Sequence, residues 1–80
     1  MKLFGYVNSE ARPGDVVPAS LAEVTVVASP AELRSMARFL GECADRMDKM
    51  GDTFDHEHLG DNFKEFCDSP ELAVARDSAA

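Results

Sequence analysis

The 80-residue sequence has little cysteine, no tryptophan and no long apolar run. The two cysteines, Cys43 and Cys67, are too few for the disulfide framework of a small secreted domain, so we expect free thiols. No apolar stretch approaches the roughly 20 residues that a membrane helix needs, and residues 1–8 do not have the pattern of a signal peptide. We therefore expect one domain, over residues 1–80, that stays in the cytoplasm and off the membrane.

Motifs for catalysis are also missing from the sequence. There is no nucleophile elbow, no Gly-rich phosphate loop and no Cys/His motif in a known context. A domain of 80 residues leaves little room for a cleft of ordinary ligand size. We therefore predict a protein that is not an enzyme and needs no cofactor.

Basic residues are scarce, and they are unevenly distributed. The sequence has 15 acidic and 8 basic residues, which gives a net charge of −7. Residues 1–41 hold four acids and four bases, residues 42–71 hold ten acids and three bases, and residues 72–80 hold one of each. Since nucleic-acid binding needs a basic surface, we predict none. The acidic segment favours a basic protein partner, and the alternative is a solvated surface that keeps the protein soluble.

Alternating apolar and polar residues predict four strands around one helix. Two strands are expected over residues 2–7 and 21–27, on either side of a loop from Asn8 to Ser20. Two more are expected over residues 53–59 and 71–75, followed by a frayed tail over 76–80. The prediction is an α+β domain of order ββαββ, in which a small antiparallel sheet carries the long helix on one face.

The best-determined element is an amphipathic helix from about Pro30 to Met50. Ser29 at the N-cap, Pro30 at the first helical position and Glu32 three residues after the cap form a capping box. Gly51 is expected to end the helix with a left-handed backbone. A second, shorter helical turn is expected to be capped by Asp61 and to carry two phenylalanines, Phe63 and Phe66.

The two sides of the long helix differ in polarity. On the polar side, Glu42–Arg46 and Asp45–Lys49 are expected to form pairs worth a few tenths of a kcal/mol each. The apolar residues of the other side recur with helical period, and we expect them to form the core. The expected stripe is Leu33, Met36, Ala37, Leu40, Ala44 and Met47, widened by Phe39, Cys43 and Met50.

The two N-terminal strands carry apolar residues on both faces. Ala22, Val24 and Val26 share one face of the second strand, and we expect four apolar side chains opposite them, namely Phe4, Tyr6, Leu21 and Val27. One helix covers only one face, so the uncovered face is expected to be an interface, either in a homodimer or with a partner. The alternative is that a loop or residues 63–66 fold over it.

One cluster, Asp55-His56-Glu57-His58 with Asp61 close behind, could carry chemistry. On a strand, both imidazoles point to one face, some 6–7 Å apart at the backbone. Two such rings can hold one zinc, nickel or copper ion, and Asp61 or Cys67 could complete the ligands. Because spacing does not fix a third and fourth ligand, His56 and His58 are weak metal candidates, and we predict no bound metal.

Two other interpretations of the histidine pair remain open. In the first, Phe54, His56 and His58 face the core, and each imidazole is hydrogen-bonded to a carboxylate or a carbonyl. In the second, the two histidines lie in an acidic, partly exposed patch. Both interpretations give the pair a structural or partner-binding role.

Several runs of the sequence together resemble a known family. They are Lys2–Tyr6, Ser29–Arg34, Ala37–Ala44 with Met47 and Gly51, and Phe54–Leu59 with Asp61. These runs are similar to the bacterial immunity proteins of family 32, small proteins associated with polymorphic toxin systems. The similarity covers nearly the whole chain, with the weakest fit at Asn8–Ser20 and after Asn62.

The resemblance implies an inhibitor that binds a cognate toxin stoichiometrically and does not turn it over. The negative charge agrees with this, because immunity proteins against nucleases often cover a basic substrate groove. We predict that the following residues contact the toxin: Asp45, Asp48, Asp52, Asp55, His56, Glu57, His58 and Asp61. The alternatives are a metal-binding domain using His56 and His58, and a self-associating structural domain without a toxin.

Overall fold

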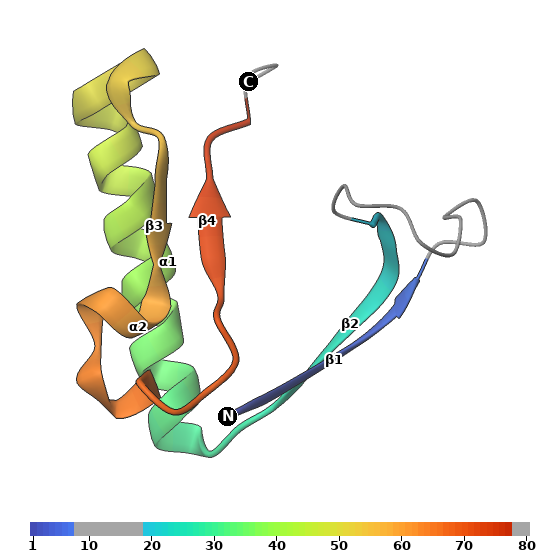
Figure 1. Ribbon diagram of the computed structural model, residues 1–80. Coiled ribbons are helices and arrows are strands. Elements are labelled where there is room, and N and C mark those ends of the chain that lie inside the picture. Colours follow the sequence, from blue (N-terminus) through green and yellow to red (C-terminus); the bar gives the residue numbers. More distant parts are fainter. Residues whose placement is uncertain (8–18, 78–80) are drawn as a thin grey trace.

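The computed structural model describes residues 1–7 and 19–77 of the chain (Figure 1). Its elements run β1 (Lys2–Val7), β2 (Leu21–Val27), α1 (Pro30–Met50), η1 (Gly51–Thr53), β3 (His56–His58), α2 (Leu59–Asn62), η2 (Lys64–Phe66) and β4 (Ala73–Ala75), where η marks a short 3₁₀ helix. The α+β class is confirmed. Most of the expected loop, residues 8–18, and the last three residues of the expected tail lie outside the described residues.

The strands form two small sheets and not the single sheet that we expected. β1 pairs with β2, and β3 pairs with β4, both antiparallel. The long helix α1 lies alongside β3 and β4, whereas the β1–β2 hairpin extends away from this body (Figure 1). The helix therefore leaves both faces of the hairpin uncovered, and every residue of β2 is exposed.

The start of α1 forms as the sequence predicts. The Ser29 hydroxyl oxygen accepts the Glu32 N–H at 3.1 Å, and Glu32 Oε1 accepts the Ser29 N–H at 2.9 Å, so the capping box is confirmed. Glu32 Oε2 also accepts a hydrogen bond from the α-amino group of Met1 at 2.7 Å, which joins the start of β1 to the helix. This ammonium group first, and the Ser29 N–H second, hold the pKa of Glu32 below its ordinary value.

The helix ends at Gly51 with a positive φ of 55°, as expected, but its ψ of −129° lies outside the left-handed helical region. Its N–H donates to the Met47 carbonyl. Thr53 Oγ1 donates to the Met50 carbonyl at 2.7 Å, which continues the turn into η1. The strand that we expected over residues 53–59 is therefore too long: Thr53 belongs to η1, and β3 begins only at His56.

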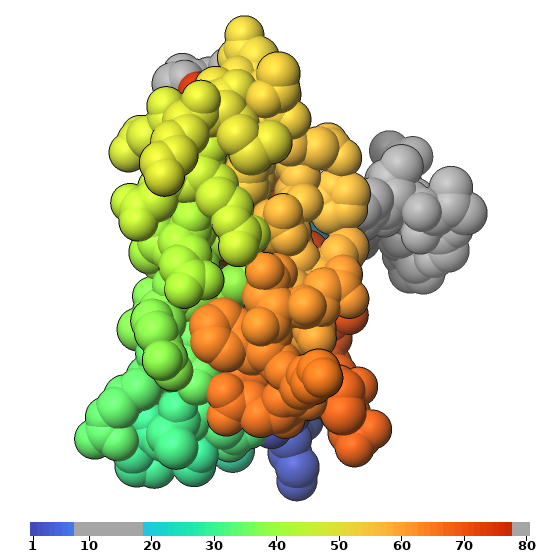
Figure 2. Space-filling model, turned by 90° about the vertical axis from the view of Figure 1, so that its left-hand side faces the viewer, coloured from blue at the N-terminus to red at the C-terminus, as the bar shows by residue number. Residues whose placement is uncertain are grey.

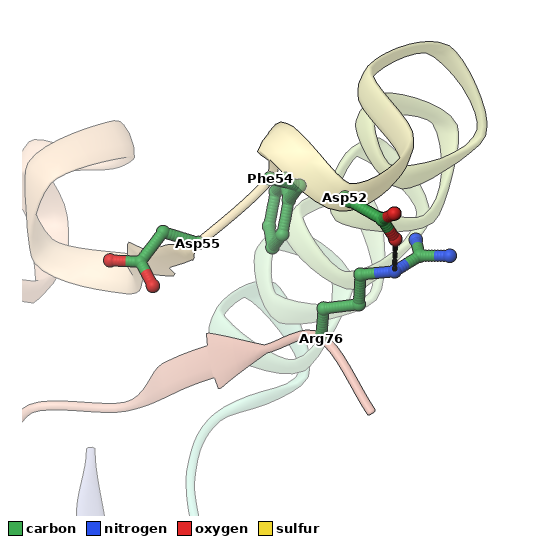
Figure 3. A pocket seen from close by; sticks show the side chains of 4 residues that line it. All are labelled: Asp52, Phe54, Asp55 and Arg76. Atoms are coloured by element: carbon green, nitrogen blue, oxygen red, sulfur yellow. Dashed lines mark ion pairs between the residues drawn. The ribbon is translucent and has the colours of Figure 1, made fainter. Parts of the chain in front are cut away.

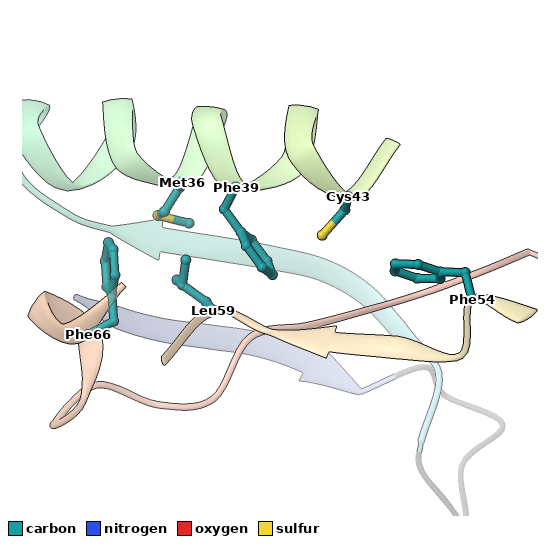
Figure 4. Packing of buried hydrophobic residues seen from close by; sticks show 6 residues of the cluster. All are labelled: Met36, Phe39, Cys43, Phe54, Leu59 and Phe66. Atoms are coloured by element: carbon teal, nitrogen blue, oxygen red, sulfur yellow. The ribbon is translucent and has the colours of Figure 1, made fainter. Parts of the chain in front are cut away.

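The core lies between α1 and the segments that follow it (Figure 4). Its buried members are Met36, Phe39, Cys43, Phe54, Leu59 and Phe66. The predicted stripe is partly wrong, because Leu33 and Leu40 are 49% and 50% exposed; Phe39 and Cys43, which we expected to widen it, are buried. The helix turns Phe39 inward because Phe54, Leu59 and Phe66 pack on this side of it. Full burial of the Phe39 ring stabilises the fold by about 2–3 kcal/mol relative to an exposed ring.

The end of β3 is set by Leu59, which is buried at the first position of α2. The Leu59 N–H donates to the Leu72 carbonyl at 2.8 Å, which continues the β3–β4 register by one bond, and the turn of α2 begins at the same residue. Asp61 lies inside α2 and does not cap it; the N-cap is His58, which makes no side-chain capping bond. The last strand begins at Ala73 and not at residue 71, and Leu72 and Val74 pack against the core as expected.

Candidate functional site

The acidic side chains in the second half of α1 and after it lie at the surface. Asp45 and Asp48 are exposed on α1, Asp52 is exposed in η1, Asp55 precedes β3 and Asp61 lies in α2. Figure 2 shows the outer side of α1, in green to yellow, next to the orange segment that follows it. These elements thus present most of the predicted contact acids to solvent.

The pairing of β3 with β4 decides which way the two histidines point. Glu57 lies opposite Val74, whose side chain packs against the core, so Glu57 faces α1. His56 and His58 therefore point to the opposite, outer face of this sheet. Their rings meet edge to face, with centroids 4.9 Å apart.

Each histidine has a carboxylate neighbour. His56 Nδ1 lies 2.7 Å from Asp55 Oδ2, and His58 Nδ1 lies 3.7 Å from Asp61 Oδ2. The interpretation that places the histidines in the core beside Phe54 is wrong, because Phe54 is 4% exposed while the His56 side chain is 48% exposed. The structure instead places both rings in an acidic, partly exposed patch.

The carboxylates beside the two histidines do not complete a metal site in the part of the chain that the structure describes. There, no three His, Cys, Asp or Glu side chains are grouped so that they could hold a metal ion. Residues 1–7 and 19–77 likewise include no helix that is both long and apolar enough to cross a membrane.

Glu57 belongs to a polar network that joins three elements. Arg46 Nη1 on α1 lies 3.4 Å from Glu57 Oε1, and Arg46 Nη2 donates to Asn62 Oδ1 at 3.3 Å. Asn62 Nδ2 in turn donates to Glu57 Oε2 at 3.3 Å and to the His58 carbonyl at 2.9 Å. The expected Glu42–Arg46 pair is therefore wrong, and the described residues also show no Asp45–Lys49 ion pair. No local pattern points to Asn62, because its hydrogen-bond partners are brought to it only by the fold.

A surface hollow of about 300 Å³ lies where η1 approaches the end of the described chain, lined by Asp52, Phe54, Asp55 and Arg76. Figure 3 shows Asp55 on one side of the Phe54 ring and the Asp52–Arg76 pair on the other. Asp52 Oδ1 lies 4.0 Å from Arg76 Nε. We expected Arg76 in the frayed tail and did not predict its ion pair with Asp52. The pairing of β3 with β4 brings the two residues together, and no local pattern predicts it.

The structure thus brings together some of the predicted contact residues. It joins Asp55 to His56 and His58 to Asp61, and it places Asp52 and Asp55 at the same hollow. Glu57 faces α1 instead. The exposed Asp45 and Asp48 make no ion pair or hydrogen bond within residues 1–7 and 19–77.

These features define a small α+β domain with exposed acidic side chains along and after its long helix. The chain belongs to the Immunity protein 32 family, whose model matches residues 23–78. The match includes the residues after Asn62, where we expected a weak fit, and leaves out the opening Lys2–Tyr6, where we expected similarity. Neither the comparison with curated proteins nor the comparison with solved structures finds a match.

Proposed function

We propose that this protein neutralises a cognate toxin by binding it stoichiometrically, and that the toxin presents a basic surface. Membership of the Immunity protein 32 family supports an immunity role. The finer proposal rests on one observation: all seven units of excess negative charge lie in residues 42–71, where six aspartates are exposed. Five of the six, from the second half of α1 to α2, we call the acidic surface; they are Asp45, Asp48, Asp52, Asp55 and Asp61.

An exposed acidic surface acts mainly on the rate at which a basic partner arrives. Carboxylates in water interact weakly as single pairs, but their summed field extends over about one Debye length, about 8 Å at physiological salt. Such a field raises association rates above the unsteered range and suppresses like-charged partners. The protein then works in the cytoplasm, by covering the toxin and without turnover.

In this proposal, the hollow beside Phe54 accommodates one basic side chain of the toxin. Its rim carries the carboxylates of Asp52 and Asp55, which would bind an ammonium or guanidinium group, and the Phe54 ring would contact the apolar stem of the same side chain. The Asp52–Arg76 pair is 4.0 Å long and its aspartate is fully exposed, so a closer cation can displace Arg76 at little cost.

The remaining predicted residues take supporting roles in this proposal. Glu57 is held by Arg46 and Asn62, so it fixes β3 and α2 against α1 and keeps the hollow in shape. His56 and His58 lie beside Asp55 and Asp61, so they flank the contact at its edge.

Co-expression with a candidate toxin encoded by an adjacent gene tests the proposal. The parent should restore growth, and Asp52→Asn/Asp55→Asn should need more expression to do so, because the hollow loses both carboxylates. Glu65→Gln/Asp68→Asn removes the same charge at exposed positions away from the hollow and should rescue like the parent. If the parent does not rescue, the immunity proposal fails for that toxin; if both doubles behave alike, the assignment of the hollow fails.

A further inference from the structure

The β1–β2 hairpin has one face that is wholly apolar. Directly paired residues of an antiparallel ladder share a face, and the register pairs Leu3 with Val26 and Gly5 with Val24. A register shift after Tyr6 pairs Val7 with Leu21, and the Leu21 side chain lies over Gly5, 2.9 Å from where a Cβ would be. Leu21 is therefore on this face and not on the opposite one that we expected. The apolar hairpin face consists of Leu3, Val7, Leu21, Val24 and Val26.

This face is uncovered in the single chain. Val7, Leu21, Val24 and Val26 are 39–57% exposed. One of the two covers that the sequence offered, residues 63–66, packs elsewhere, because Phe66 is buried in the core and Phe63 meets Phe39 edge to face. The other, the loop, lies mostly outside the described residues. A two-stranded sheet with no cover is marginally stable at best in water, so a hairpin of this composition needs a packing partner.

The helix α1 has a second uncovered apolar surface, at Leu33, Ala37, Leu40 and Ala44, which we call the helix stripe. Its residues alternate at spacings of four and three, so they lie on one side of the helix. All four are exposed, because the helix turns Met36, Phe39 and Cys43 to the core instead. The chain thus has an apolar sheet face and an apolar helix stripe, which are the two surfaces that pack together in an α+β layer.

We propose that a second copy of this chain covers both surfaces: the apolar hairpin face of each copy packs on the helix stripe of the other. A two-fold arrangement of this kind is closed, and each copy supplies what the other lacks. The exposed parts of these side chains amount to roughly 650 Å² per copy, or about 1,300 Å² in all, within the range of stable interfaces.

Charge favours a second copy over the toxin at this place. Residues 1–41, which contain the hairpin and most of the helix stripe, are net neutral, while residues 42–71 carry −7. Two copies can meet through the neutral half without bringing their acidic surfaces together. The two strands of the hairpin carry one lysine and one glutamate, Lys2 and Glu23, so they offer a strongly basic toxin no net complementary charge.

Sedimentation equilibrium of the purified chain tests the dimer. The parent, of 8.7 kDa per chain, should sediment at twice that mass, and Val24→Lys and Leu40→Lys should each halve the mass. Thr25→Lys is the matched control, because Thr25 is exposed on the opposite face of the same strand and the variant should stay dimeric. Since Val24 and Leu40 are half exposed, the helical circular-dichroism signal of α1 should be the same in their variants as in the parent. A monomeric parent, or a Val24→Lys variant that stays dimeric, overturns the proposal.

Cross-linking tests the reciprocal arrangement. In a Cys67→Ser background, chains carrying Val24→Cys are mixed with chains carrying Leu40→Cys and oxidised. Covalent pairs of one chain of each kind support hairpin-on-helix packing. Pairs formed only between Val24→Cys chains would mean that two hairpins pack face to face, and this arrangement would be wrong.

Discussion

Replacing Ser29 by alanine removes one hydrogen bond of the capping box at the start of α1. The Ser29 hydroxyl oxygen accepts the Glu32 N–H at 3.1 Å, and this N–H has no carbonyl partner one turn earlier. The reciprocal bond, from the Ser29 N–H to Glu32 Oε1, uses the backbone of residue 29 and survives the change. Because the site is exposed, water can replace the lost acceptor, so the expected cost is about 1 kcal/mol and not a full burial penalty.

In a domain of this size, about 1 kcal/mol lowers the melting temperature by roughly 4–8 °C. Thermal unfolding followed by circular dichroism measures the shift. Ser29→Asp is the matched control, because aspartate is an equally good N-cap acceptor and should melt near the parent. The capping role of Ser29 is wrong if the Ser29→Ala variant melts like the parent, or if Ser29→Asp lowers the melting temperature as much as Ser29→Ala.

Three further outcomes follow from contacts elsewhere in the chain. The pKa of Glu32 lies below its ordinary value of 4.5, so its stabilising contribution is complete above that pH and is lost as the pH falls through the lowered pKa; Glu32→Gln should therefore flatten the acid limb of a stability–pH curve. Cys43 is buried, and burial raises the pKa of its thiol, so a thiol reagent should modify only the exposed Cys67 in the native protein and both cysteines after unfolding. The half-exposed Arg46–Glu57 pair should show a coupling of about 0.5 kcal/mol in a double-mutant cycle of stability, and a coupling of zero would remove its role in holding β3 to α1.

Local signals in the sequence were sufficient to predict the long helix to the residue. The N-cap serine, the following proline, the glutamate three residues on and the closing glycine each act within one turn. The buried face of the helix was harder to predict, because the apolar residues span a wide arc. The core packs on the part of the arc that holds Phe39 and Cys43, because Phe54, Leu59 and Phe66 lie there. Leu33 and Leu40 stay exposed, and no local pattern in the sequence predicts this difference.

The candidate site shows the same limit. Alternation in Asp55–His58 predicts correctly that the two histidines share a face, but it cannot say whether that face is inward. The answer depends on the pairing of Glu57 with Val74, a residue 17 positions further along the chain. The partners of Arg46 and the place of Arg76 at the hollow are set by the same long-range packing.

Stopped-flow association at two salt concentrations measures whether the acidic surface captures a basic toxin electrostatically. The toxin identified by co-expression is mixed with the parent, with Asp45→Lys/Asp52→Lys, and with Arg34→Glu as the control from the neutral half of the chain. The parent's association rate should fall about tenfold between low and high salt, the aspartate reversals should slow it further at low salt, and Arg34→Glu should do much less. A salt-independent rate shared by all three proteins would rule out electrostatic capture and would move the toxin contact to the uncharged surfaces of the molecule.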